Sequence, residues 1–192
     1  MIIEGIVTSH NPEGLLNIAP MGPIVDETLT WFRLRPFQTS TTFRNLKGTR
    51  CGVFHVVDDV LLIAQAAINQ LPPVVPIRPA IHIPGQVLEA ACRWYEFAVE
   101  TLDDSQERSE IQCRVVHAGT VRDFFGFNRA KHAVLEATIL ATRLHLIPHE
   151  QIRTQLEALK IIVDKTAGPR EFEAYDLIHS YIHNSFTSNH PE

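Results

Sequence analysis

Apolar residues are spaced in different ways before and after about residue 125, and this difference limits the folds that the chain can adopt. In several segments of the first part, apolar and polar positions alternate, as in a strand whose side chains point to opposite faces in turn. The clearest case is residues 93–102, where Tyr95, Phe97 and Val99 fall on one face and Glu96 and Glu100 on the other. From Asn128 on, apolar residues recur every three or four positions, which is the spacing of one helix face. The sequence therefore predicts a mostly β first part and a helical remainder.

Composition narrows the class of protein. The chain has 192 residues, of which 45% are hydrophobic and 20% charged, and this is the profile of a globular protein with one domain, or one domain and an appendage. The net charge of −5 argues against nonspecific nucleic-acid binding, which needs clustered cations. No apolar run is long enough to span a membrane, and the first residues lack the basic region of a signal peptide. A cytoplasmic protein is expected.

The first part contains several β-branched and aromatic runs bounded by turn residues. Asn11-Pro12-Glu13-Gly14 fits a type I turn between the first two strands. The expected strands are residues 4–10, 15–19, 28–34 and 51–57, followed by a hairpin formed by residues 93–102 and 111–115. Pro20, Gly22 and Pro23 are expected to break the second strand, and Pro36 to end the third.

Five helices complete the expected elements, of which a short one opens at the hydroxyl run Thr39 to Thr42. Of the other four, described next, one lies in the first part and three in the C-terminal part. The first begins at Asp58 or Asp59 and reaches about Asn69; because it is apolar almost all round, it is expected either in a core or at a subunit interface. The other three form the C-terminal part. Their boundaries are expected at Asn128, the N-cap of the first of these helices, at Pro148, before the second, and at Gly168-Pro169, where the second ends.

Two short segments in the first part have the composition of an anion-binding site. They are residues 17–22, Asn-Ile-Ala-Pro-Met-Gly, and residues 34–46, which contain Arg35 and the hydroxyl run Thr39 to Thr42. Arg is a forked cation that suits phosphate oxygens, and a helix that starts at the hydroxyl run presents unpaired N–H groups to an anion. The alternative is structural: Thr39 or Ser40 caps a connecting helix, and Arg35 pairs with a carboxylate.

These segments resemble the flavin-reductase-like FMN-binding split barrels, in which an Asn-x-Ala/Ser-Pro strand and a Thr-rich turn ending in Asn line the flavin. Within that group the chain is most similar to an uncharacterised-domain family. The late signature of that family resembles Phe125-Gly126-Phe127-Asn128-Arg129-Ala130, with Glu136 and Thr142-Arg143 further along. The resemblance implies an FMN-binding split β-barrel over residues 1–125, mainly β with α, and a C-terminal three-helix addition over residues 126–192 that packs on the barrel.

The resemblance also implies a cofactor, a partner and a set of binding residues. The cofactor is FMN, and the partner is a second copy in a homodimer with each flavin near the interface. Its phosphate is expected at Arg35, Gln38, Thr39, Ser40, Thr41 and Thr42, with Asn45 either completing that shell or capping the turn. The ribityl chain and ring are expected against Asn17, Ala19, Pro20 and Met21. Phe37 and Phe54 either supply apolar faces or belong to the core, and Arg129 is either a second phosphate ligand or a surface residue.

Three functions are consistent with this interpretation. The first is an FMN-dependent oxidoreductase, in which the flavin carries the redox chemistry and the protein positions it. The second is a flavin carrier, sensor or store without turnover, and the third is a barrel that has lost the cofactor and serves only in assembly. The sequence names no catalytic acid or base and has no nicotinamide-binding signature, and fold resemblance does not fix a reaction.

Other reactive residues have structural explanations. Cys51, Cys92 and Cys113 lie in apolar settings without metal-binding spacing, so buried free thiols are expected. His179 and His183 are four residues apart, a spacing that zinc can use, but no third ligand is indicated, and no metal site is expected. His55 and His117 are either proton donors of the site or histidines of the core and the sheet edge.

Overall fold

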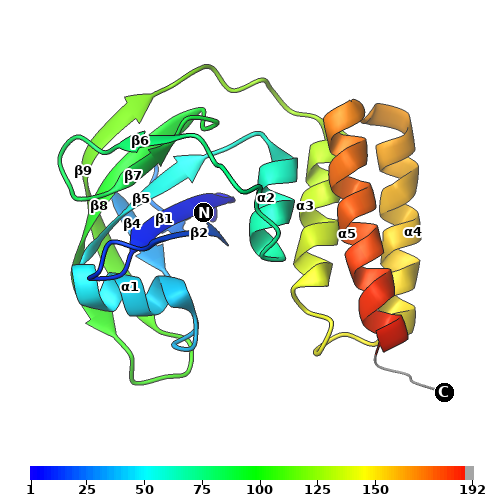
Figure 1. Cartoon of the computed structure of the whole chain (residues 1–192), viewed down its shortest axis with the longest axis horizontal. Coiled ribbons are helices and arrows are strands. Elements are labelled where there is room, and N and C mark those ends of the chain that lie inside the picture. The colour runs from blue at the N-terminus through cyan, green and yellow to red at the C-terminus, as the bar shows by residue number, and fades with distance from the viewer. Residues whose placement is uncertain (189–192) are drawn as a thin grey trace. The chain divides into compact units, whose positions relative to one another are not determined.

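The structure is a computed structural model that describes residues 1–188; the last four residues of the expected C-terminal region lie outside it. The chain forms two compact units (Figure 1). The first, called the barrel unit, consists of Met1–Val57 and Val74–Phe124. The second, called the helical unit, consists of Asp58–Pro73 and the chain from Phe125 on. Residues 58–73 thus belong with the helices, although the sequence grouped them with the barrel.

The barrel unit is built on a seven-stranded antiparallel sheet in the order β2-β1-β5-β8-β9-β4-β3 (Figure 1). Its strands are β1 (Gly5–His10), β2 (Leu16–Met21), β3 (Ile24–Val25), β4 (Trp31–Leu34), β5 (Cys51–Val56), β8 (Arg93–Asp103) and β9 (Glu110–Thr120). Ile2 forms a bridge with Ile24, and Ile3 N–H donates to the Pro23 carbonyl at 3.2 Å. Because residues 1–3 lead into β1, these contacts bring the β3 edge round to the start of β1. The sheet therefore curls into the split barrel that the sequence predicted.

Aromatic side chains fill the interior of the barrel. Phe32 packs edge-on against Phe54 and Tyr95, with ring centroids 5.4 and 5.6 Å apart. Phe43 and Leu46 of α1 (Thr41–Thr49) join the same core, so this helix packs against the inner face of the sheet. Burial of this apolar surface is the main stabilising contribution to the unit.

A hairpin of β6 (Ile77–Pro79) and β7 (Gln86–Leu88) covers part of the outer face of the barrel. Val87 of this hairpin packs on Val53 and Trp94. Glu96, fully buried, accepts hydrogen bonds from the N–H groups of Ile81 and His82 at 2.8 and 2.7 Å. The irregular, proline-rich connection that the sequence predicted is thus held in place by a buried carboxylate.

Two strand boundaries differ from expectation for local reasons. The third expected strand begins at Trp31 rather than Thr28, because the Asp26 side chain accepts the N–H groups of Thr30 and Trp31 at 2.9 and 3.0 Å and holds a turn there. The second strand runs through Pro20 to Met21 instead of breaking. Since β2 is an edge strand, the missing N–H of Pro20 costs no ladder bond.

The helical unit consists of α2 (Val60–Ala67), α3 (Arg129–Ala141), α4 (His149–Thr166) and α5 (Pro169–Ser188). The Asp59 and Asn128 side chains cap α2 and α3, as the sequence indicated. Val60, Leu61, Ala64 and Ile68 share one apolar core with α3, α4 and α5. The expectation that this apolar helix is buried is confirmed, and the three C-terminal helices are confirmed as well.

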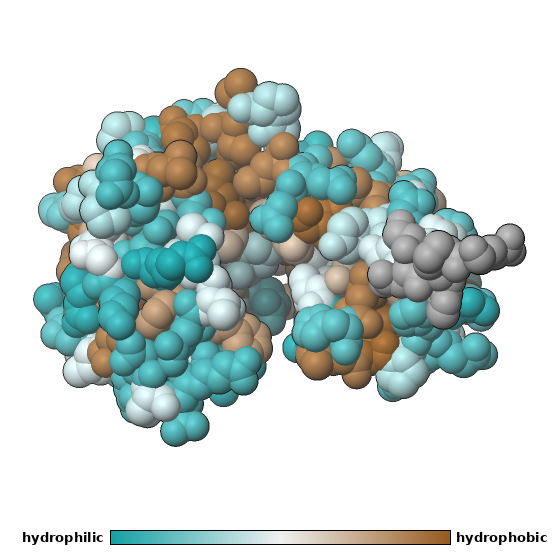
Figure 2. All heavy atoms as spheres, turned by 60° about the horizontal axis from the view of Figure 1, so that its bottom comes forward, coloured by the Kyte–Doolittle hydropathy of each residue, from teal (hydrophilic) through white to brown (hydrophobic). Residues whose placement is uncertain are grey.

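Apolar side chains also reach the surface on both units (Figure 2). On the barrel unit they include Val74, Ile77 and Ile81 around β6. On the helical unit, Phe125 and Phe127 are the most exposed, at 84% and 92%. No helix in residues 1–188 is both long and apolar enough to cross a membrane.

Candidate functional site

The two segments singled out in the sequence meet on the barrel unit. The side chain of Asn17 on β2 donates to the Thr42 hydroxyl in the first turn of α1, at 3.1 Å. Asn17 lies opposite Ser9 in the β1–β2 register, and the Asn45 amide donates to the Ser9 hydroxyl at 3.2 Å. These four side chains join the edge strand to the helix. The tertiary fold therefore brings together Asn17, Thr42 and Asn45, while their contact with FMN stays a prediction.

The start of α1 is capped and still presents donors. The Ser40 hydroxyl accepts the N–H of Phe43 at 3.1 Å, so the capping role left open for Thr39 or Ser40 is taken by Ser40. A helix start leaves its first N–H groups without intrahelical acceptors. Since Ser40 takes that of Phe43, the N–H groups of Thr41 and Thr42 are left for an anion, at the positive end of the helix dipole.

Arg44 is a cation at this helix start that sequence reasoning missed. Its guanidinium donates to the Thr39 carbonyl at 2.6 Å and to the Thr41 hydroxyl at 3.0 Å. A signal was present: Arg44 is three residues after Thr41, so both side chains lie on one side of the helix. Arg44 also lines a groove of about 470 Å³ with Leu16, Asn17 and Thr41. That volume is in the range of small-molecule sites, about 300–1,000 Å³.

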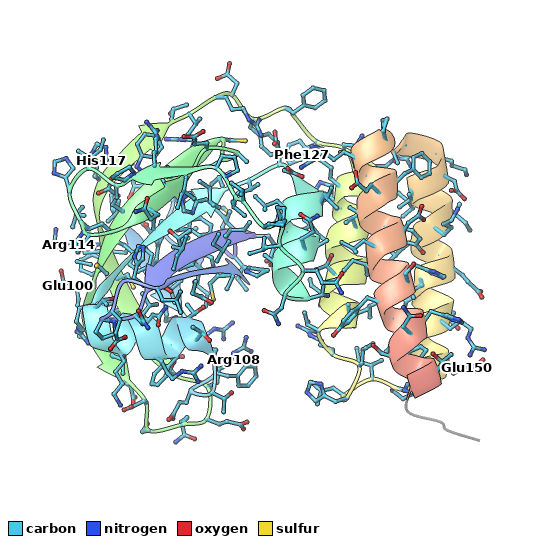
Figure 3. All side chains as sticks on the ribbon, in the orientation of Figure 1. Glu100, Arg108, Arg114, His117, Phe127 and Glu150 are labelled. Atoms are coloured by element: carbon cyan, nitrogen blue, oxygen red, sulfur yellow. The ribbon has the colours of Figure 1, made fainter. Side chains whose placement is uncertain are left out.

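Arg35 lies half-buried at the end of β4. Among residues 1–188 it has no ion-pair partner, so the alternative pairing with a carboxylate is not formed. Its backbone carbonyl accepts the Arg108 Nε–H at 2.9 Å, and the Arg108 guanidinium lies 5.1 Å from the centroid of the Phe37 ring (Figure 3). Gln38 is occupied elsewhere, since its amide donates to the carbonyls of Asp104 and Gln106 at 2.7 Å each.

The remaining candidates divide between the edge strand β2, the core and the other unit. Ala19 and Pro20 are half-buried on β2, and Met21 packs against the barrel core. Phe54 is fully buried in that core, which is the second of the two roles left open for it. Arg129 is the exposed first residue of α3 in the helical unit, and its role as a second phosphate ligand stays a prediction.

The histidine and cysteine candidates have structural roles. His55 is fully buried and bonded at both ring nitrogens, and its pKa is lowered to about 4 by burial. His117 is half-buried on β9 and packs beside His82, with ring centroids 4.7 Å apart (Figure 3). All three cysteines are buried free thiols, as expected, and burial raises the pKa of Cys113 to about 12. In the described part of the chain no three potential ligands gather as a metal site requires.

Comparison with known proteins identifies the family. The model described as "Protein of unknown function (DUF447) N-terminal domain" matches residues 3–122, and the model "Protein of unknown function (DUF447)" matches residues 128–180. The chain belongs to the DUF447 family. This confirms the resemblance to an uncharacterised-domain family, and the two matches adjoin near residue 125. A search of curated proteins found no match.

Several solved structures similar to this DUF447 chain name a flavin in their titles. An FMN-bound DUF447 protein, MM1853 from Methanosarcina mazei, is 24% identical with a TM-score of 0.79, and the match covers 94% of each chain. Component B of nitrilotriacetate monooxygenase from Bacillus cereus is 23% identical with a TM-score of 0.54, covering 62% of this chain and 70% of that one. An FMN-binding protein from Thermus thermophilus is 14% identical with a TM-score of 0.53, and the match covers 62% of this chain and 70% of that one. These similarities establish the split-barrel fold.

Proposed function

We propose that this chain binds FMN on the barrel unit, in the groove between β2 and the start of α1, and that it acts as a flavin-dependent oxidoreductase. The hydrogen bond between Asn17 and Thr42 carries the proposal, because it joins the strand motif to a helix start that already holds a cation. The FMN-bound family member supports the choice of cofactor.

Each part of the groove suits one part of FMN. The phosphate carries a charge of about −1.5 to −2 near neutral pH, so it needs cations as well as N–H groups. Arg44 and the N–H groups of Thr41 and Thr42 supply both at one end, and Arg35, without an ion-pair partner among residues 1–188, is a second guanidinium in the same unit. Bidentate guanidinium–phosphate bonds are about twice as strong as neutral hydrogen bonds.

The edge strand suits the planar ring. Because β2 pairs with β1 on one side only, its other side presents backbone N–H and C=O groups. Such groups complement the polar edge of a flavin ring, and half-buried Ala19 and Pro20 allow the ring to approach closely. Bound FMN would supply the hydride and electron chemistry, while the protein binds and orients it.

The binding test compares FMN with riboflavin, which lacks the phosphate. The Arg44→Ala and Arg35→Ala variants are expected to bind FMN about 10–100-fold more weakly, the value of one charge-assisted contact, with riboflavin affinity little changed. Arg33→Ala is the matched control, because Arg33 is half-exposed and pairs with Glu110 at 3.6 Å on the surface. Binding is followed by quenching of flavin fluorescence. Equal losses for both ligands would refute the phosphate role.

The reaction requires its own measurement. In an oxidoreductase, NADH or NADPH added without oxygen should bleach the absorption band of the oxidised flavin. Addition of an electron acceptor should then restore that band. If a chemical reductant reduces the bound flavin but neither NADH nor NADPH does, a flavin carrier would be favoured instead. The homodimer with flavin near the interface belongs to the same proposal and is tested by light scattering. The cytoplasmic location stays a prediction.

A further inference from the structure

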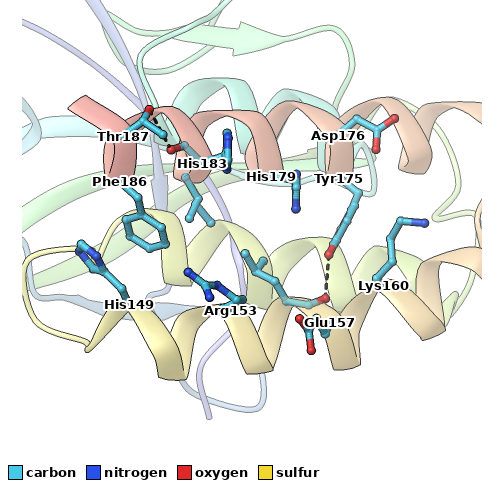
Figure 4. Close-up of a pocket in the computed structure, with 12 residues that line it drawn as sticks. His149, Arg153, Glu157, Lys160, Tyr175, Asp176, His179, His183, Phe186 and Thr187 are labelled. Atoms are coloured by element: carbon cyan, nitrogen blue, oxygen red, sulfur yellow. Dashed lines mark hydrogen bonds between the residues drawn. The ribbon is translucent and has the colours of Figure 1, made fainter. Parts of the chain in front are cut away.

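The helical unit contains a second concave site, unrelated to the proposed flavin groove. It is a groove of about 1,080 Å³ between α4 and α5 (Figure 4). The groove lies entirely within the helical unit. None of the residues proposed above to bind FMN lines it, so its role is independent of the flavin proposal.

The floor of this α4–α5 groove is apolar. Leu156 and Ile182 form part of it, with 6% and 1% of their surfaces exposed. The Tyr175 hydroxyl donates to the Leu156 carbonyl at 2.7 Å and so ties the two helices together (Figure 4). Burial raises the pKa of Tyr175 to about 12, which keeps this hydroxyl protonated and donating near neutral pH. The floor is therefore the outer edge of the apolar core of the helical unit.

One end of the groove is suited to an anion. Arg153 lies there, and among residues 1–188 it has no hydrogen-bond or ion-pair partner. His149, the first residue of α4, stacks on Phe186 with ring centroids 3.8 Å apart, and His183 lies on the facing helix (Figure 4). The N-terminus of α4 follows Pro148, which makes no side-chain cap, so the positive end of the helix dipole is also at this end.

The other end has a different charge. Glu157 and Asp176 lie towards it, and Lys160 is engaged with Asp164 at 2.5 Å. The groove is thus polarised rather than uniformly basic. A doubly anionic chain or a nucleic-acid backbone would meet carboxylates along its length, whereas a molecule with one anionic head and an uncharged body would not.

From these features we infer that the α4–α5 groove binds a small aromatic carboxylate. The carboxylate would pair with the Arg153 guanidinium, and its ring would lie over the apolar floor against Phe186. A guanidinium fork matches a carboxylate bidentately, and ligand sites are commonly apolar with a few polar groups that fix orientation.

The test uses naphthalene-2-carboxylate as the probe and naphthalene-2-carboxamide as its uncharged counterpart. Titrations are made by calorimetry on the full chain, both with FMN added in excess and without it, so that the outcome does not depend on flavin binding. The carboxylate is expected to bind at one site, about tenfold more tightly than the carboxamide, which is the difference expected for one charge-assisted contact.

Two variants locate the contact. Arg153→Gln is expected to abolish the preference for the carboxylate and leave carboxamide affinity unchanged, while the far-ultraviolet circular dichroism stays that of the wild type. Lys165→Gln is the control, since Lys165 is an exposed cation in the last turn of the same helix, outside the groove. Histidine ring NMR signals of His149 and His183 should shift with the probe in the wild type and in the control.

Three results would overturn the inference. The first is no saturable binding up to about 1 mM, the weakest affinity that such a site would be expected to have. The second is equal affinity for carboxylate and carboxamide. The third is full retention of the preference in the Arg153→Gln variant, which would place the carboxylate elsewhere.

Discussion

His55 shows how one buried side chain links the parts of the barrel unit. Its Nδ1–H donates to the Ile6 carbonyl and its Nε2 accepts the Leu88 N–H, each at 3.1 Å. These bonds connect β5 to β1 and to the β6–β7 hairpin, and they require the neutral ring with the proton on Nδ1. A second proton on Nε2 would face an N–H donor. Burial without a counter-charge therefore makes His55 a structural residue rather than a proton donor.

A pH dependence of stability follows from this arrangement. In the unfolded chain His55 takes up a proton near pH 6.5, whereas in the fold its pKa is about 4. Between these values the unfolded state binds more protons, so stability should fall as the pH drops from 6.5 towards 4, by about 3 kcal/mol from this group. Urea unfolding followed by the fluorescence of Trp31 and Trp94 at several pH values measures this fall.

The matched variant for this prediction is His55→Gln, which cannot titrate. It is expected to be less stable at neutral pH, because it cannot reproduce both hydrogen bonds, but its stability should change less between pH 6.5 and 4. The informative quantity is the change in the free energy of unfolding with pH, since this change does not depend on the stability at neutral pH. A variant with the same slope as the wild type would show that other groups cause the acid sensitivity.

Arg44 marks the limit of sequence reasoning for single residues. Its cationic side chain is evident in the sequence, but a charged residue on a helix is most often only solvated. Only the conformation of the 39–44 turn places its guanidinium over the Thr39 carbonyl and the Thr41 hydroxyl.

Phe54 is a residue whose role the sequence left open, because its aromatic ring suits a flavin and a core equally well. The register of β5 between β1 and β8 turns this ring into the core.

At the scale of elements, the β6–β7 hairpin depends on Glu96. Burial would raise the pKa of this carboxylate, but the N–H groups of Ile81, His82 and the Trp94 indole lower it below its usual value. Both oxygens accept hydrogen bonds, from Ile81 and His82 respectively. The carboxylate thus holds the turn of this hairpin, while Val87 and Leu88 anchor its second strand through packing on Val53 and Trp94 and through the bond to His55.

Replacing this carboxylate tests the dependence. Glu96→Gln places an NH₂ group against an N–H donor, so it is expected to lower the free energy of unfolding by about 2 kcal/mol, as for a lost charge-assisted hydrogen bond. The amides of Ile81 and His82 should exchange with deuterium faster than in the wild type. Glu100→Gln on the same strand is the control, because Glu100 is exposed and pairs with Arg114 at the surface (Figure 3). Unchanged exchange at the hairpin would contradict the assignment.

At the scale of the whole molecule, the helical unit is discontinuous in sequence. Its helix α2 comes from residues 58–73, inside the segment that the sequence assigned to the barrel. Val60, Leu61, Ala64 and Ile68 bury their apolar surface in the core formed with α3, α4 and α5. A boundary drawn where the residue spacing changes therefore does not separate two independent units.

A chain cut after Phe125 should expose this surface. We expect it to aggregate in size-exclusion chromatography, because four apolar side chains of α2 lose their cover. The same fragment with Leu61→Gln and Ile68→Gln should aggregate less, although the substitutions lie outside the barrel unit. A monodisperse, cooperatively unfolding wild-type fragment would show that the barrel unit does not need the C-terminal helices.

The sequence by itself determined what local physics controls. The spacing of apolar residues indicates a mostly β part before residue 125 and helices after it. Asp59, Asn128 and Gly168-Pro169 mark helix ends, because capping and turn formation involve neighbouring residues only. The family resemblance added the split barrel and the cofactor.

The tertiary structure decided what depends on contacts between distant residues. It placed α2 with the helices, turned Phe54 into the core, joined Asn17 to Thr42 and opened the α4–α5 groove. Each of these outcomes is set by register and by packing between segments tens of residues apart. Spacing along one strand or helix carries no information about which partner that element will meet.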